Sequence, residues 1–285
     1  MSVMTNKLSI SIFSLFLALC TVPFAAAAAT GNGDRVAVPL SDPARPAFVK
    51  AHLLNGSIVV KGYEGKEVIV EARARGGDDS DRESGGGGMH RIPINSTGLE
   101  VEEESNRVNV GAASTQRAID LTISVPVHTS LSLHTVNDGD ISVSNVDGEL
   151  DVNDVNGSVT LTGVSGTAVA HALNGKVLVT FNRINATKPM AFSSLNGDID
   201  VTFPAELKAN LIISSDRGDV FSDFDVAMAA RAPQQVAQDG RSSDGSYHVK
   251  IDKTVRGTIN GGGPEIQFRN FNGNIYIRKA GVKAQ

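Results

Sequence analysis

Residues 138–180 decide the fold: DGDISVSNVDGELDVNDVNGSVTLTGVSGTAVAHALNGKVLVT. Five glycines recur nine residues apart in this stretch, at positions 139, 148, 157, 166 and 175. Each follows an Asp, Asn or Ser, which favour tight turns, and we expect the glycine itself at a positive φ, which it adopts without steric cost. A fixed short period is typical of stacked repeats. The stretch therefore predicts a repeated unit of one short strand and one tight corner.

Apolar and polar residues alternate within each unit. Counted from the glycine, positions +2 and +4 are apolar, as in Ile141 and Val143, with a polar residue such as Ser142 between them. Successive side chains of a strand point to opposite faces, so positions +2 and +4 share one face, which we expect to be the interior. Beyond the corner, we expect position +7 to point into the same interior, in Val146, Val155, Val164 and Leu173.

Two strand arrangements fit such a repeat. Asn-Gly is also a strong hairpin signal, so an antiparallel meander is the alternative. A nine-residue unit would leave hairpin strands little longer than their turns, whereas stacked coils use the same unit without conflict. After Gly175 the series continues with Gly197 and Gly218, so each later coil is slightly longer. We therefore predict an all-β fold, a parallel β-solenoid like a β-helix, built of nonapeptide strand–turn units with about 18–22 residues per coil.

The composition suits layered strands. The chain has 285 residues, a formal net charge of −5, 41% hydrophobic residues, 5% aromatic residues and no Trp. We expect a core of Val, Ile, Leu and Ala, because large rings are scarce. No basic stripe is present to neutralise phosphates, so we expect no nucleic-acid partner.

The N-terminus reads as a targeting segment. Lys7 precedes an apolar stretch that ends near Phe24, and small residues follow through Ala29. This pattern predicts a secretory signal peptide over residues 1–29, and so a protein exported to the periplasm, the cell surface or the extracellular space. Lipidation of Cys20, the single cysteine, is the alternative. No later stretch approaches the roughly 18 apolar residues of a membrane helix, so we expect no transmembrane span in the mature chain.

The rest of the chain divides by composition. Residues 30–46 are polar and contain proline, so we predict a linker, followed by a single β-solenoid domain over residues 47–285. Two mobile loops are expected within it, at residues 76–88 (GGDDSDRESGGGG) and at residues 227–247. We also expect two short strands, Leu99–Glu103 and Arg107–Val110, around a turn at Ser105 and Asn106.

Candidate chemical groups do not form a recognisable site. His134 and His171 lie five and four residues before their glycines, so we expect them to point in different directions. A set of acidic side chains crowds the array: Asp138, Asp140, Asp147, Glu149, Asp151 and Asp154. Carboxylates with calcium and a basic residue serve in polysaccharide-cleaving β-helices, but no basic row accompanies these. No G-x-S-x-G elbow is present either. We therefore assign no catalytic, cofactor-binding or metal-binding residue.

The order of the repeats resembles the DUF4097 family of bacterial adhesin-like β-strand repeat proteins. The resemblance is carried by GSIVVKGYEGKEVIVEA, DLTISVPVHTSLSLHTVNDGDISV, VNGSVTLTGVSG, LNGDIDVTFP and INGGGPEIQFRNFNGNIYIRK, which together span most of the mature chain. It implies an exported, right-handed parallel β-solenoid. The family offers no catalytic residues to carry over to this sequence.

We therefore expect a non-enzymatic structural or binding module of the cell envelope, without a cofactor. Outward Ser, Thr, Asn and Asp rows would contact an envelope protein or a glycan, whose identity the sequence does not give. The alternative is a lyase-like enzyme that acts on extracellular polysaccharide at the acidic array. End-to-end self-association is a third possibility, although Arg278, Lys279 and Lys283 would discourage it.

Overall fold

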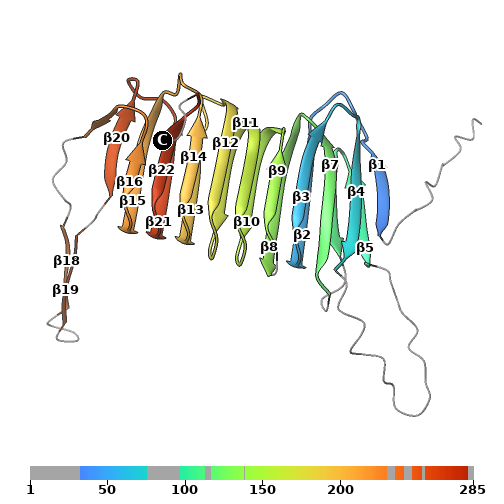
Figure 1. Ribbon diagram of the computed structural model, residues 1–285, viewed down its shortest axis with the longest axis horizontal. Coiled ribbons are helices and arrows are strands. Elements are labelled where there is room, and N and C mark those ends of the chain that lie inside the picture. The colour runs from blue at the N-terminus through green and yellow to red at the C-terminus, as the bar shows by residue number, and fades with distance from the viewer. Residues whose placement is uncertain are drawn as a thin grey trace, which may run out of the picture. The chain divides into compact units, whose positions relative to one another are not determined.

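The computed structural model describes residues 33–75, 97–112, 117–137, 139–229, 235–240, 246–251 and 254–281. The chain divides into two units, residues 1–30 and residues 31–285, and the description below concerns the second unit. The described residues contain strands and turns and no helix (Figure 1). The predicted signal peptide over residues 1–29 and the loop predicted at residues 76–88 lie outside the described residues.

Twenty of the strands form one continuous sheet with two faces. Face A consists, in spatial order, of β1 (Asp34–Pro39), β4 (Glu67–Ala74), β7 (Ile119–Pro126), β3 (Ile58–Tyr63), β9 (Ile141–Ser144), the first half of β11 (Val159–Ala172), β12 (Val177–Ile184), β14 (Ile199–Phe203), β22 (Ile275–Lys279) and β16 (Val220–Ser222).

Face B consists, in the same direction, of β5 (Leu99–Glu104), β6 (Arg107–Ala112), β2 (Ala47–Asn55), β8 (Thr129–Asn137), β10 (Asp147–Asp154), the second half of β11, β13 (Met190–Asn196), β21 (Glu265–Asn272), β15 (Ala209–Arg217), β20 (Val255–Ile259) and β17 (Val226–Met228). Two further strands, β18 (Gln235–Gly240) and β19 (Ser246–Ile251), pair with each other in a separate antiparallel ladder.

The repeated stretch pairs in parallel, so the antiparallel meander is excluded for it. Ile141 pairs with Val159 and Val159 with Val177, a constant spacing of two nine-residue units. On face B, Leu131 pairs with Leu150, which exceeds that spacing by one residue. Antiparallel pairs lie at the two ends of the stack, where β4 meets β1 and β7, β5 meets β6, and β20 meets β15 and β17.

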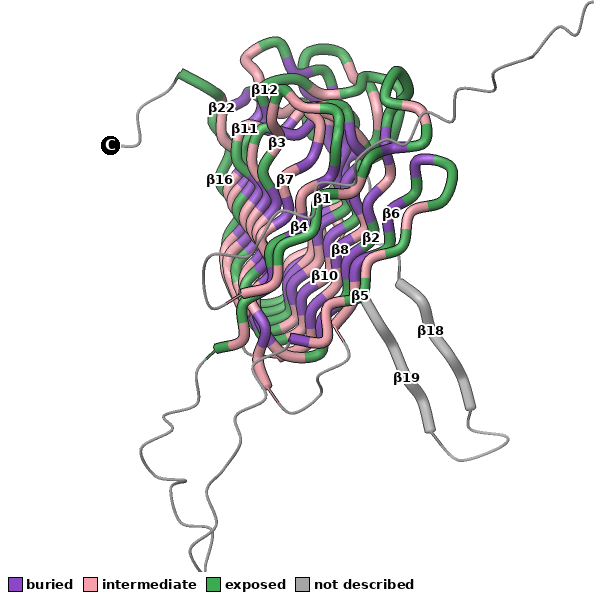
Figure 2. The backbone as a smooth tube through the Cα atoms, turned by 90° about the vertical axis from the view of Figure 1, so that its right-hand side faces the viewer, coloured by how far each residue is buried: buried purple, intermediate pink, exposed green. Residues whose placement is uncertain are grey.

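The core lies between the two faces, as the end-on view shows (Figure 2). Side chains at positions +2 and +4 are buried, including Ile141, Val143 and Leu161. The core is less uniformly aliphatic than the composition predicts. Four phenylalanines on neighbouring strands pack ring against ring at centroid distances of 5.4–6.5 Å: Phe181, Phe192, Phe203 and Phe268.

The corner glycines are explained mainly by close backbone approach. Gly166 has a positive φ of 101°, but Gly139, Gly148, Gly157 and Gly175 do not fall in that region, which corrects the expectation of a positive φ at each corner. A Cβ on Gly157 would lie 2.1 Å from the carbonyl oxygen of Gly139, in the coil beneath. No side chain fits at that distance.

Two segments differ from the sequence prediction. Residues 34–39, placed in a linker, form the edge strand β1 and pair with β4, and Val38 packs partly buried against the core. Residues 227–247, predicted as a mobile loop, contribute to β17, β18 and β19. The predicted turn at Ser105 and Asn106 does join two antiparallel strands, and both residues have positive φ.

Candidate functional site

A row of exposed and half-buried apolar side chains follows one edge of face B, one per coil. We call it the apolar stripe: Leu54, Val136, Val155, Leu173, Leu195 and Phe271. Backbone hydrogen bonds set its order, since the Val155 N–H donates to Thr135 and the Leu173 N–H to Asp154. Leu54, Leu195 and Phe271 are 42%, 39% and 40% exposed. Single exposed apolar residues are ordinary, but a contiguous apolar patch is typical of an interaction surface.

The stripe corrects the prediction that every +7 residue is buried. Val146 and Val164 are buried, whereas Val155 and Leu173 lie half-buried in the stripe. The difference arises one residue earlier. Asn145 and Gly163 have left-handed φ values of 57° and 61°, which reverse the alternation before Val146 and Val164. Units without such a residue stay extended, so Val155 and Leu173 point outward.

An asparagine ladder lies beside the stripe at the corner. The Asn156 Nδ2 donates to Asn137 Oδ1, the Asn174 Nδ2 to Asn156 Oδ1, and the Asn196 Nδ2 to Asn174 Oδ1, each at 2.9 Å. Asn156, Asn174 and Asn196 are exposed, so their remaining donors and acceptors can reach solvent. The stripe therefore has a polar border capable of hydrogen bonding.

The polar row next to the glycines mainly serves the stack itself. The Ser158 N–H donates to Asp140 Oδ1 at 2.7 Å, the Lys176 N–H to Ser158 Oγ at 3.3 Å, and the Asn274 N–H to Asp198 Oδ1 at 2.9 Å. Each side chain thus satisfies the backbone of the next coil. This part of the outward polar surface is engaged within the protein.

The acidic array of the sequence is dispersed among separate contacts. Asp147 pairs with Arg183 at 2.8 Å, with His128 Nδ1 at 3.4 Å, and Glu149 pairs with Lys188. Asp138 lies outside the described residues. Among the residues with described structure, no group of three or more His, Cys, Asp or Glu could hold a metal ion.

His134 and His171 lie in one column of side chains, whereas their spacing from the glycines predicted that they point in different directions. His134 pairs with Asn153, which pairs with His171. Leu131 and Leu150 are 19 residues apart, one more than two nine-residue units. This extra residue compensates for the one-residue difference between the distances of His134 and His171 from their glycines, so both histidines face the same side. The His52 and His134 rings stack at 5.3 Å, and burial, followed by the charge of His52, lowers the pKa of His134.

A polar column is buried behind the stripe. Thr135 Oγ1 donates to the Gly56 carbonyl at 3.0 Å, Ser194 Oγ to Gly175 at 2.9 Å, and Asn270 Nδ2 to Gly197 at 2.9 Å. Asp154 occupies the same column, and neither of its carboxyl oxygens has a hydrogen-bond partner of good geometry.

The environment of Asp154 favours its neutral form. Burial is the main cause that raises the pKa of Asp154 to about 7, and the carboxylate of Asp140 contributes in the same direction. The nearby N–H groups of Gly157 and Asn156 act in the opposite direction, but the burial effect is larger.

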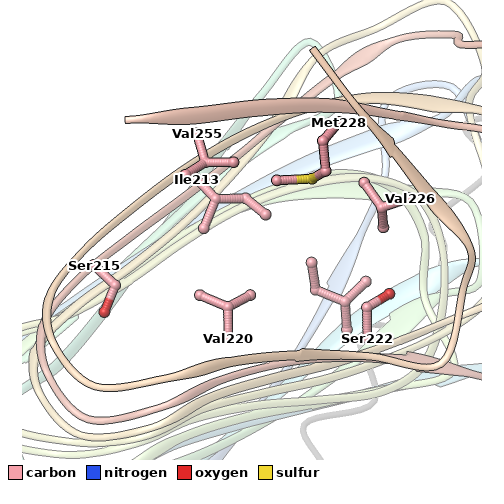
Figure 3. Close-up of a pocket in the computed structure, with 8 residues that line it drawn as sticks. Ile213, Ser215, Val220, Ser222, Val226, Met228 and Val255 are labelled. Atoms are coloured by element: carbon pink, nitrogen blue, oxygen red, sulfur yellow. The ribbon is translucent and has the colours of Figure 1, made fainter. Parts of the chain in front are cut away.

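A pocket of about 390 Å³ lies where the stack ends at β15, β16 and β20 (Figure 3). Its lining is almost wholly apolar: Ile213, Val220, Val226, Met228, Val255 and Ile277, with Ser215 and Ser222. The two hydroxyls already donate to backbone carbonyls, of Gly218 and Phe224. The pocket therefore presents apolar surface and no free hydroxyl donor.

Sequence reasoning assigned no site residue, and it missed the stripe. The available signal was the residue before position +7: Asn or Gly tolerates a positive φ, whereas Ala172 does not. No helix long and apolar enough to cross a membrane occurs in the part of the chain that the structure describes.

Comparisons with known proteins give a family and several distant structures. The Toastrack DUF4097 family model matches residues 56–260. A "putative cell adhesion protein" from Clostridium sporogenes ATCC 15579 is 9% identical with a TM-score of 0.36, covering 87% of this chain and 99% of that chain. A "putative adhesin" from Bacteroides fragilis NCTC 9343 is 14% identical with a TM-score of 0.32, covering 87% of this chain and 96% of that one. No curated protein matches the sequence.

Proposed function

Because the chain belongs to the Toastrack DUF4097 family, we propose that it is an exported, non-enzymatic, adhesin-like binding module of the cell envelope. The apolar stripe and its asparagine border are the proposed contact surface. The partner is an envelope protein or glycan that meets apolar groups along the stripe and hydrogen-bonds to the asparagine amides.

The observation that carries this proposal is the exposure of the stripe. Strand alternation brings six apolar side chains to the surface in one line, and Leu54, Leu195 and Phe271 are each about two-fifths exposed. A surface of this kind suits an extended partner better than a small substrate, because specific interfaces need a broad patch with an apolar centre and a polar rim.

Two further parts of the proposal concern architecture and export. The parallel pairings between successive coils support a parallel β-solenoid, which we propose is right-handed and forms a single domain over residues 47–285, with residues 34–39 added as the edge strand β1. Residues 1–29 serve as the signal peptide. Mass spectrometry of the protein recovered from periplasm and medium tests export, since the chain should begin within or just after residues 25–29. A chain that stays in the cytoplasm with Met1 intact contradicts it.

The binding test uses a matched pair of exposed leucines. Leu195 in the stripe is 39% exposed, and Leu178 on the outer side of face A is 40% exposed. We expect Leu195→Ser to weaken binding to immobilised envelope glycans and envelope membrane proteins about tenfold, and Leu178→Ser to leave it unchanged. Equal binding by both variants, or no binding of the unmodified protein to any of these preparations, would sink the proposal. Turnover of a uronate polymer would support a lyase instead.

A further inference from the structure

We propose that Asp154 is a protonated carboxylic acid in the folded protein, that it donates a hydrogen bond to the Gly139 carbonyl oxygen, and that its ionisation is a pH-sensitive release within the stack. The inference concerns the fold and holds whatever partner the apolar stripe binds.

The buried polar column supplies the first argument. In the coils of Thr135, Ser194 and Asn270, the column residue donates to the carbonyl of the glycine in the preceding coil. Asp154 is the strand neighbour of Thr135, and the glycine of its preceding coil is Gly139. By this equivalence, a donor on Asp154 would do what Thr135, Ser194 and Asn270 do in their coils, while Ala172 in the next coil has no donor. A carboxylate only accepts hydrogen bonds, whereas a carboxylic acid has one O–H to donate.

The geometry at Gly157 supplies the second argument. A Cβ placed on that glycine would lie 2.1 Å from the Gly139 oxygen and 2.8 Å from Asp154 Oδ2, so both oxygens lie close to the same point in space. The carboxyl group and the Gly139 carbonyl thus share one corner of the stack, where an O–H of Asp154 has an acceptor to meet. Two acceptors without a proton between them would instead repel each other.

The backbone N–H groups of Gly157 and Asn156 favour an ionised Asp154, but the effect of burial is larger. The side chain is fully buried, and both oxygens lack partners of good geometry. Its neighbours across the strands, Thr135 and Ala172, carry no charge. The charged group that acts on it is Asp140, whose carboxylate repels a second negative charge. An unpaired buried charge is strongly unfavourable, so the proton stays on Asp154 or the local packing opens.

The sign of the pH effect follows from proton binding. The folded protein holds the Asp154 proton with a pKa of about 7, and the unfolded chain with a pKa of about 3.9. Stability from this group is therefore complete below about pH 4 and is lost as the pH rises through 7. Because Val155 and Asn156 follow Asp154 directly, the loss would loosen one rung of the stripe and of the asparagine ladder.

The direct test is a carbon-13 NMR titration of the aspartate carboxyl groups in the folded protein, with Asp154 assigned by its absence in Asp154→Asn. We expect its midpoint near pH 7, against values near 4 for exposed aspartates. A midpoint below about pH 5.5 overturns the proposal, and one above it supports the proposal. The titration itself uses the unmodified protein, and a variant is needed only to assign the Asp154 signal. If Asp154→Asn does not fold, Asp154→Thr can be used for the assignment instead.

Thermal unfolding between pH 5 and pH 8.5 tests the consequence. The melting temperature of the unmodified protein should fall by several degrees more than that of Asp154→Asn, whose amide keeps a donor at every pH. Asp198→Asn is the control, because its carboxylate caps the Asn274 N–H at the surface and it should follow the unmodified protein. If the melting temperatures of the unmodified protein and Asp154→Asn changed equally with pH, the proposed destabilisation by ionised Asp154 would be contradicted.

Discussion

At the scale of single residues, the corners of the stack depend on backbone contacts that leave no room for a side chain. The carbonyl oxygen of Gly139 would lie 2.1 Å from a Cβ on Gly157, and that of Gly157 would lie 2.0 Å from a Cβ on Gly175. The glycines therefore form a column in which each coil rests directly on the backbone of the one before. A methyl group at one member has to push two coils apart.

Gly157→Ala should lower the free energy of unfolding by at least about 2 kcal/mol, since the overlap is with backbone and cannot be relieved by a rotamer change. Gly111→Ala in β6 is the control. A Cβ there meets nothing within 4 Å, so its effect should stay within about 0.5 kcal/mol. Urea denaturation of both variants measures the difference, and a similar midpoint for the two would show that the column tolerates side chains.

The residue scale also shows how far sequence reasoning reached. The nine-residue period and the alternation correctly located the buried aliphatic residues at positions +2 and +4, because both depend on local strand geometry. Val155 was predicted to point into the core, but it points outward. Its direction depends on whether the residue before it adopts a positive φ, as Asn145 does and Asp154 does not. Because Val155 was assigned to the core, sequence reasoning found neither the apolar stripe nor the burial of Asp154.

At the scale of strands, side-chain ladders join neighbouring coils in addition to the backbone hydrogen bonds between them. The asparagine ladder is continuous from Asn137 through Asn156 and Asn174 to Asn196. The two inner amides, Asn156 and Asn174, each donate to one neighbour and accept from the other, which is possible because Asn has both groups. Asn therefore recurs before Gly157, Gly175 and Gly197 for a reason that no single unit reveals.

Asn174→Ala should cost about 1 kcal/mol of stability, because it removes one donated and one accepted bond at an exposed site. A double-mutant cycle with Asn156→Ala isolates the bond between the two amides, and we expect a coupling free energy of about 0.5 kcal/mol. Chemical denaturation of the four proteins gives this value. Strictly additive single effects would mean that the ladder does not stabilise the stack.

The phenylalanine cluster joins neighbouring strands, and the amino-acid composition did not predict it. Phe192 is 1% exposed and contacts the rings of Phe181, Phe203 and Phe268. Low aromatic content suggested an aliphatic core, but composition does not report that four of the rings occupy neighbouring strands.

Phe192→Ala should lower the free energy of unfolding by about 3–5 kcal/mol through the cavity it leaves. Phe221→Ala, at a ring that is 49% exposed, should cost about 1 kcal/mol or less. Calorimetric melting of both variants provides the comparison. An equally small loss for Phe192→Ala would indicate that the cluster is loosely packed.

At the scale of the whole stack, stability should be close to a sum over coils, because each coil contacts mainly its two neighbours. The pairings of Ile141 with Val159 and of Val159 with Val177 mean that residues 157–174 span one full coil. Its removal leaves Asn156 followed directly by Gly175, as in an ordinary unit.

Deletion of residues 157–174 should therefore give a folded, cooperatively melting protein of reduced stability. Deletion of residues 158–174 is the matched control. It leaves one extra residue, so it places the following strand out of step, and a shift of one residue moves every buried side chain to the wrong face. Circular dichroism and melting curves distinguish the two. Equal behaviour would contradict the dependence on register.

One corner of the stack already accepts more chain length than the nine-residue repeat provides. Ile184 pairs with Gly166 and Ala191 pairs with Val169. Gly166 and Val169 are three positions apart, whereas their partners are seven positions apart, so the later coil absorbs four additional residues at this bend. The strands on either side keep their alternation. A foreign epitope spliced between Asn185 and Lys188 would therefore project from a rigid base, which makes this bend a natural point for peptide display.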